Sequence, residues 1–159
     1  MTIPLVGDRA LPHDYAERIT DISPAMVADQ HLVIDWDASV TRHGRWRAET
    51  EIVTWLAEQP ITGLSVATAN PWVRQARGLE DWQPRIYGTR IIRNPETGRR
   101  KLTTKAQISF YTDLANQEEL EPAQITVIDN SYLVGAAAAS RGGCRVILRH
   151  PLTMGIRPE

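Results

Sequence analysis

Short apolar runs, each followed by polar residues, recur along this chain and predict its architecture. Four of them have the composition of strands buried on both faces of a sheet, and they lie at residues 32–35, 64–67, 125–129 and 144–148. Stretches with helical spacing of apolar residues or with helix-start signals lie before and between them, at residues 24–29, 48–59, 72–83, 105–116 and 133–140. Because the two kinds of element alternate, we expect an α/β fold with a mainly parallel sheet and helices on both faces.

Residues 85–101 break this alternation. Two short runs of mixed apolar and basic residues flank Asn94–Gly98, and the sequence Asn-Pro-Glu-Thr-Gly is a turn signal that predicts a β-hairpin. Seven basic residues and a single acid, Glu96, lie between Arg85 and Lys105. Two interpretations stay open, a solvated surface hairpin or a surface that binds an anionic partner such as a nucleic acid or a lipid headgroup.

Polar residues follow three of the predicted strands at the same end. They are Asp35 and Asp37 after the first strand, Thr68 and Asn70 after the second, and Asp129 at the end of the third. The carboxyl ends of parallel strands meet at one edge of the sheet, where α/β proteins bind their ligands. Because buried carboxylates without a counter-charge are costly, this set predicts a metal site or a catalytic site. The alternative is that Asp35 caps a loop and Asp37 is solvated.

Composition narrows the range of functions. The 159 residues are 42% hydrophobic and 23% charged, and we expect one domain over residues 1–159. A net charge of −1 gives no overall field that would select a partner. One cysteine, Cys144, excludes an internal disulfide framework and a cysteine-based zinc site. The sequence contains no apolar run of membrane-spanning length and no signal-peptide core, so a cytoplasmic location is expected.

The polar-ended strands resemble the four motifs of the haloacid dehalogenase (HAD) superfamily in order and spacing. Ile34–Val40 is similar to the first motif, a DxDx[TSV] signature after an apolar strand, and Ala67–Asn70 to the second. Lys105 is similar to the third-motif lysine, for which Lys101 is the other candidate, and Val127–Asn130 is similar to the fourth motif. The family fold is a three-layer Rossmann-like arrangement.

The resemblance covers about residues 19–152 and is greatest to subfamily IIIA, the YqeG-type phosphatases, which include phosphatidylglycerophosphate phosphatases. The matching C-terminal pattern includes Gly135 and Arg149. The room for a cap domain is only Thr41–Gly63, so the site would be open to large substrates. Three tryptophans near its entrance would be packing residues or substrate platforms: Trp46, Trp72 and Trp82.

This resemblance implies a Mg²⁺-dependent phosphatase that forms an aspartyl-phosphate intermediate. Asp35 would be the nucleophile, and Asp37 would be the general acid and base. Mg²⁺ would be held by Asp35, the backbone carbonyl of Asp37, and Asp129. The phosphate would be bound by Thr68, Asn70 and Lys105.

The sequence departs from the family pattern at four places, two of which are Ile128 for the usual glycine before the fourth-motif acid and Ala38-Ser39 for the usual Asn-Thr after the second acid. At the other two, the second acid of the fourth motif is replaced by Val134, and the Lys-Pro pair of the subfamily is Lys105-Ala106. The alternative hypothesis is therefore a catalytically degenerate HAD-like domain that binds a phosphorylated partner or a nucleic acid.

Overall fold

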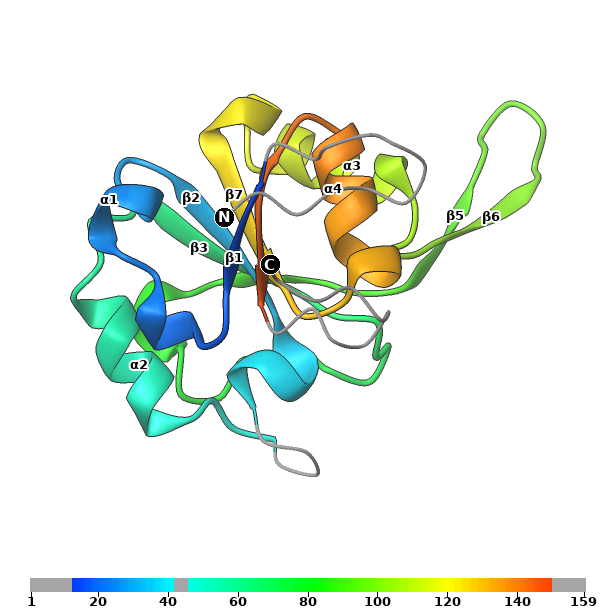
Figure 1. Ribbon diagram of the computed structural model, residues 1–159. Coiled ribbons are helices and arrows are strands. Elements are labelled where there is room, and N and C mark those ends of the chain that lie inside the picture. The colour runs from blue at the N-terminus through cyan, green and yellow to red at the C-terminus, as the bar shows by residue number, and fades with distance from the viewer. Residues whose placement is uncertain (1–12, 42–45, 150–159) are drawn as a thin grey trace.

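The fold is a three-layer α/β/α arrangement of Rossmann-like type (Figure 1). The computed structural model describes residues 13–41 and 46–149. Six strands form one sheet in the order β1-β8-β7-β2-β3-β4, and every neighbouring pair is parallel. These strands are β1 His13–Ala16, β2 His31–Asp35, β3 Gly63–Ala67, β4 Arg85–Tyr87, β7 Ile125–Asp129 and β8 Arg145–Arg149. The predicted parallel sheet is therefore confirmed.

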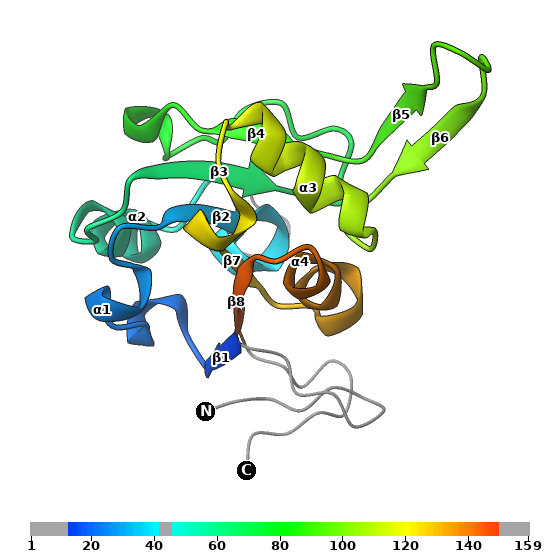
Figure 2. The ribbon, with the colours of Figure 1, turned by 90° about the horizontal axis from the view of Figure 1, so that it is seen from above.

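Helices cover both faces of this sheet, as the alternating pattern predicts. Figure 2 shows α1 (Pro24–Val27) and α2 (Thr50–Ala57) on one side, and α3 (Ile108–Gln117) and α4 (Ala137–Arg141) on the other. Successive strand residues face opposite layers. In β2, Leu32 and Ile34 join the buried cluster under α1 and α2, whereas Val33 joins the cluster under α3 and α4. The central strands are consequently mostly apolar and are buried on both faces along their whole length.

The predicted hairpin is present and stands away from the main sheet (Figures 1 and 2). It consists of β5 (Arg90–Arg93) and β6 (Arg100–Thr103), paired antiparallel. The side-chain oxygen of Asn94 accepts hydrogen bonds from the backbone amides of residues 96 and 97, at 2.8 and 3.2 Å. Gly98 has a φ of 69°, which glycine adopts at no steric cost. The turn signal in the sequence thus formed the turn that it predicted.

Three sequence-based expectations are wrong in detail. The segment 85–87 is not an arm of the hairpin but strand β4, at the edge of the main sheet. Strand β1 at the opposite edge has no counterpart among the predicted strands. The helix expected at 72–83 is an irregular segment that ends in a 3₁₀ turn, Glu80–Trp82. It buries Val73, Ala76 and Leu79, whose helix-like spacing produced the error.

Helix boundaries also differ from the expected ones. Helix α3 begins at Ile108, so Lys105 lies in a turn before the helix rather than in its first turn. The stretch expected to be helical at 133–140 is a π-helical turn, Tyr132–Ala136, that leads into α4. Nowhere in 13–41 or 46–149 is a helix long and apolar enough to cross a bilayer. The predicted loop 41–47 lies partly, and the irregular tail from 150 wholly, outside the described residues.

Candidate functional site

The two central strands of the sheet both end in a carboxylate. Strand β2 ends at Asp35 and strand β7 at Asp129, and the register pairs Ile34 with Ile128 immediately before them. The two acids therefore lie side by side at the carboxyl edge of the sheet. They are 4% and 0% exposed, so water does little to solvate their charges. A pair of buried carboxylates requires a counter-charge nearby.

Lys105 supplies that counter-charge. Its ammonium hydrogen-bonds to Oδ1 of Asp35 and lies 2.7 Å from Oδ2 of Asp129, and the lysine is itself 3% exposed. Burial favours the neutral amine, but the charges of Asp129 and Asp35 outweigh this effect and raise the pKa of Lys105. The lysine is therefore charged, and two carboxylates with one ammonium leave one formal negative charge in the buried cluster.

The alternation of side chains along the strands explains why these three groups meet. Asp35 lies two residues after Val33, and Asp129 lies two residues after Val127, so both acids share the face that is covered by α3 and α4. Lys105 lies in the turn that leads into α3. The turn before the helix thus brings the lysine to the carboxylates from the same side of the sheet.

Asp37 and Thr68 form a second, neighbouring pair. Asp37 lies in the π-helical turn Trp36–Val40 after β2, which Trp36 anchors in the core at 2% exposure. The Thr68 hydroxyl donates a hydrogen bond to Oδ2 of Asp37 and accepts one from the backbone amide of Asn70 at 3.0 Å. The one hydroxyl proton of Thr68 is therefore directed at Asp37, and it fixes the position of that carboxylate.

The side chain of Asn70 has a local role in this structure. Its amide oxygen accepts a hydrogen bond from the backbone amide of Trp72 at 2.9 Å, which closes a tight turn after β3. Asn70 contributes to the site through its backbone contact with Thr68. Of the six residues that the sequence predicts for the site, the structure brings five side chains into two hydrogen-bonded groups, Asp35–Lys105–Asp129 and Asp37–Thr68.

Gly135 lets the chain pass directly over Asp129. A Cβ atom at position 135 would overlap the Asp129 carboxylate, so only glycine fits there without a shift of that side chain. Oδ1 of Asp129 accepts a hydrogen bond from the backbone amide of Ser131 at 2.8 Å. Oδ2 faces the ammonium of Lys105 at 2.7 Å.

Tyr111, a buried residue of α3, is a further polar neighbour of the site. Its hydroxyl is buried and has no hydrogen-bond partner among the described residues. Burial, together with the charges of Asp129 and Asp35, raises the pKa of Tyr111 well above its ordinary value. In the sequence, Tyr111 falls at a core position of the helical pattern of α3. That pattern predicts burial but does not indicate that its hydroxyl lies near the carboxylates.

The oxygen atoms of the site fit Mg²⁺ in kind. Mg²⁺ is commonly bound through one or two carboxylates, with substrate and water oxygens completing its coordination. Asp35 and Asp129 provide two buried carboxylates. Among the described residues no group of three or more His, Cys, Asp or Glu is placed to hold a metal ion. Val134, where the HAD pattern has an acid, is 42% exposed and adds no ligand.

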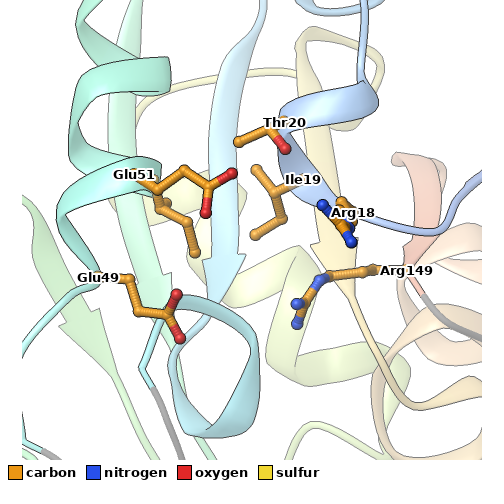
Figure 3. A pocket seen from close by; sticks show the side chains of 7 residues that line it. Arg18, Ile19, Thr20, Glu49, Glu51 and Arg149 are labelled. Carbon is orange, nitrogen blue, oxygen red and sulfur yellow. The ribbon is translucent and has the colours of Figure 1, made fainter.

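A separate pocket lies next to the start of α2 (Figure 3). It has a volume of ≈ 290 Å³ and is lined by Arg18, Ile19, Thr20, Glu49, Glu51, Ile52 and Arg149. Figure 3 shows charged groups of both signs around the opening, with Glu49 and Arg149 on opposite sides of it. None of the carboxylates of the candidate site lines this pocket. Its mixed charge is not what an anion-binding site requires.

Comparison with solved structures gives a weak likeness. No family model and no curated protein matches the sequence. Among solved structures, a similar chain is the UTR4 protein (Unknown transcript 4 protein) of Saccharomyces cerevisiae, with a TM-score of 0.43 and 11% sequence identity. The likeness covers 71% of this chain and 54% of the yeast chain, so it spans about half of that protein. A likeness of this strength assigns neither a family nor an activity, and the proposals below depend on the geometry of the site.

Proposed function

We propose that this chain is a Mg²⁺-dependent phosphomonoesterase of the HAD type, which acts through an aspartyl-phosphate on Asp35. One observation carries the proposal, the position of the Lys105 ammonium between Asp35 and Asp129 at the carboxyl ends of the two central parallel strands. Stability alone is a poor explanation for a buried ion cluster of this kind, because removing the charges from water can cost as much free energy as their attraction gains. It is well suited to receive a phosphoryl group, whose negative charge a lysine and a cation would neutralise.

The first half of the reaction is a displacement at phosphorus. An oxygen of the Asp35 carboxylate attacks the phosphorus atom, the bond from phosphorus to the leaving oxygen breaks, and the phosphoryl group becomes bound to Asp35. Asp37, protonated for this step, gives its proton to the leaving oxygen. Thr68 holds the Asp37 carboxyl in place through its hydroxyl. Lys105 pairs with the charge that develops on the equatorial phosphoryl oxygens.

The second half returns the enzyme to its starting state. Asp37, now a carboxylate, takes a proton from a water molecule as that water attacks phosphorus. The bond between phosphorus and the Asp35 oxygen breaks, which releases inorganic phosphate and regenerates the Asp35 carboxylate. The same residue acts first as acid and then as base, so one well-oriented Asp37 serves both halves.

Mg²⁺ would be held by the side chains of Asp35 and Asp129 and by the backbone carbonyl of Asp37. When bound, it supplies positive charge that offsets the repulsion between the phosphate and the Asp35 carboxylate. The formal negative charge left over in the Asp35–Lys105–Asp129 cluster is an electrostatic reason for a cation to bind there.

The substrate proposed for this site is large or anionic. The described residues around the site form no cap domain, and the insertion between β4 and α3 is the two-stranded hairpin. Register pairs Arg93 with Arg100 and Ile91 with Leu102, so that these four side chains share one face of the hairpin. This face would contact parts of a substrate that extend beyond the phosphate being cleaved.

A phosphatase screen with and without Mg²⁺, beside the variant Asp35→Asn, tests the proposal. We expect Mg²⁺-dependent turnover of small phosphomonoesters that the variant lacks, because an amide cannot attack phosphorus. If the wild-type protein shows no Mg²⁺-dependent turnover, the result would favour the alternative, a degenerate domain that binds phosphorylated partners. Turnover that persists in Asp35→Asn would contradict both the nucleophile and the mechanism.

A further inference from the structure

Two exposed tryptophans line a cavity beside the candidate site. The cavity has a volume of ≈ 380 Å³ and is lined by Trp46, Trp72, Val73, Arg74, Gln75 and Arg77. Trp46 is 62% exposed and Trp72 is 74% exposed. A large aromatic side chain stabilises a fold or a complex most when it is covered, because it can then bury 150–250 Å² of surface. Two uncovered indoles at one cavity indicate a surface that a ligand covers.

The walls of this cavity are held together by backbone contacts. The backbone amide of Ala48 donates a hydrogen bond to the carbonyl of Arg77 at 2.9 Å, and Arg47 pairs with Arg77 in a parallel β-bridge. Gly78 has a φ of 96°, and a Cβ there would lie 3.1 Å from the Cβ of Ala48. The segment that carries Trp46 is thus fixed against the segment that carries Trp72.

A short chain of hydrogen bonds connects the cavity with the candidate site. The amide of Trp72 is bound by the Asn70 side chain at 2.9 Å, and the amide of Asn70 is bound by the Thr68 hydroxyl at 3.0 Å. Thr68 in turn contacts Asp37. On the other side of the same loop, the Thr89 hydroxyl donates to the carbonyl of Ala69 at 3.1 Å, just before the basic hairpin begins. The cavity, the site and the hairpin therefore adjoin one loop.

Positive charge is concentrated in the segment that builds these surfaces. Residues 74–101, which exclude the buried Lys105, contain eight lysines and arginines and three acids, a net charge of +5, whereas the rest of the chain carries −6. The overall charge of −1 conceals this separation. Arg74 and Arg77 belong to the positive segment and line the cavity together with the two indoles.

From these observations we infer that the cavity binds a single-stranded nucleic acid, with bases on Trp46 and Trp72 and backbone phosphates on Arg74 and Arg77. Base stacking on aromatic side chains combined with cationic contacts is how proteins bind single strands without sequence preference. A terminal phosphate of that strand would enter the candidate site, and this part of the inference depends on the proposed function. An anionic membrane surface is the competing partner for these exposed indoles and arginines.

The direct test is binding of a fluorescein-labelled oligothymidylate about ten nucleotides long, within the range that single-strand-binding folds cover. Fluorescence anisotropy is measured without Mg²⁺, so that no turnover occurs. Trp72→Ala and Trp46→Ala should each weaken binding by about 5- to 150-fold, and Trp72→Phe should retain most of the affinity. Arg74→Ala with Arg77→Ala should reduce the salt slope by about 1.4, or 0.7 per lost phosphate contact.

Arg141→Ala is the matched control, because Arg141 is an exposed arginine at the end of α4. This variant should bind the oligonucleotide with the affinity of the wild-type protein. In the Asp35→Asn variant, whose buried cluster no longer carries a net negative charge, a strand with a terminal phosphate should bind more tightly than the same strand with terminal hydroxyls. The inference is overturned if the wild-type protein shows no salt-dependent binding, if both alanine variants of the tryptophans bind as well as it does, or if it binds phosphatidylglycerol vesicles and no oligonucleotide.

Turnover of p-nitrophenyl phosphate, measured in parallel on the wild-type protein, separates this inference from the proposed function. Such a small substrate has no base to stack. Mg²⁺-dependent turnover without oligonucleotide binding would overturn the inference and leave the phosphatase in place. Tryptophan-dependent binding without turnover would support the cavity as a nucleic-acid site and contradict the phosphatase.

Discussion

Gly135 passes over the Asp129 carboxylate so closely that any side chain at position 135 would displace it. We therefore expect Gly135→Ala to lower the free energy of unfolding by about 1–3 kcal/mol, the usual cost of overpacking a buried site. The response to Mg²⁺ should weaken as well, because Asp129 is one of the two buried carboxylates proposed to bind it. Urea unfolding with and without Mg²⁺ measures both effects.

Gly88→Ala is the control for this substitution. A Cβ at Gly88 would meet its nearest neighbour, the Cγ2 atom of Thr68, at 3.7 Å, an ordinary contact distance. Its stability should change by less than about 0.5 kcal/mol. If both alanine variants had the same stability and the same Mg²⁺ response, the position of the Asp129 carboxylate would not depend on the absence of a side chain at position 135.

Removing the Lys105 ammonium should strongly destabilise the protein. In Lys105→Met, two adjacent buried carboxylates lose their counter-charge, and breaking a buried ion pair in this way costs about 3–5 kcal/mol. Added Mg²⁺ should recover part of that loss, because the metal takes over the missing positive charge. Thermal unfolding at several Mg²⁺ concentrations would measure the loss and the recovery.

Lys101→Met is the matched control, because Lys101 is an exposed residue of β6, and the structure places Lys105, not Lys101, at the carboxylates. Its stability should match that of the wild-type protein. If the two methionine variants were equally stable, the ion cluster would have no energetic importance.

His31 should make the protein less stable in mild acid. Its Nε2 lies 2.7 Å from the Ser65 hydroxyl, which donates its only proton to Glu118 at 3.0 Å, so Nε2 carries the proton of a neutral ring. Burial lowers the pKa of His31 despite the opposing charge of Glu118. In the unfolded chain the pKa returns to about 6.5. Below that pH the unfolded chain binds more protons, so stability is complete above it and decreases as the pH falls towards the lowered pKa.

The substitution His31→Gln keeps an N–H donor for Ser65 but cannot titrate. Its free energy of unfolding should therefore fall less than that of the wild-type protein between about pH 7 and pH 5. Urea titrations at the two pH values give the comparison. A wild-type decrease no larger than that of the variant would mean that His31 is protonated in the folded state.

Mg²⁺ should stabilise the folded protein through the candidate site. With two carboxylate ligands and Val134 in place of a third acid, we expect a millimolar dissociation constant, roughly −4 kcal/mol of binding. A tenfold excess over that constant adds about 1.4 kcal/mol of stability. Mg²⁺ should not stabilise the variant Asp35→Asn. It should still stabilise Asp81→Asn, the control, which neutralises an exposed acid instead. A melting temperature unchanged by Mg²⁺ in the wild-type protein would exclude this metal site.

Much of the fold could be predicted from the sequence because its central strands are buried on both faces. In β2 and β7 a buried, mostly apolar run ends in an acid, and this pattern marks both the strand and its carboxyl end. Strand β4, with Arg85 exposed at the sheet edge, has no such pattern. The segment after Asn70 was misassigned because three buried residues follow helical spacing, while Pro71 and Gly78 interrupt any helix.

The site could be predicted less fully, because its contacts join residues that are distant in the sequence and meet only in the folded chain. The sequence identifies Asp35 and Asp129 as strand ends, but the clearance over Gly135 and the position of the Tyr111 hydroxyl depend on packing between layers. The Thr68 contact with Asp37 likewise depends on the turn after β2. Trp72 shows the same limit, because its exposure next to Arg74 is a property of the folded surface.

The most direct test of the account is to trap the phosphoryl group on Asp35. In Asp37→Asn the general base is absent, so water should attack the intermediate slowly. p-Nitrophenyl phosphate is a suitable substrate, because its leaving group departs without being protonated and the intermediate still forms. The variant is mixed with this substrate and Mg²⁺, quenched in acid, and analysed by intact-protein and peptide mass spectrometry.

The account predicts a mass gain of one phosphoryl group, located on the peptide that contains Asp35 and absent from the double variant Asp35→Asn/Asp37→Asn. An unmodified protein that still releases p-nitrophenol, or a phosphoryl group on any other residue, would contradict it.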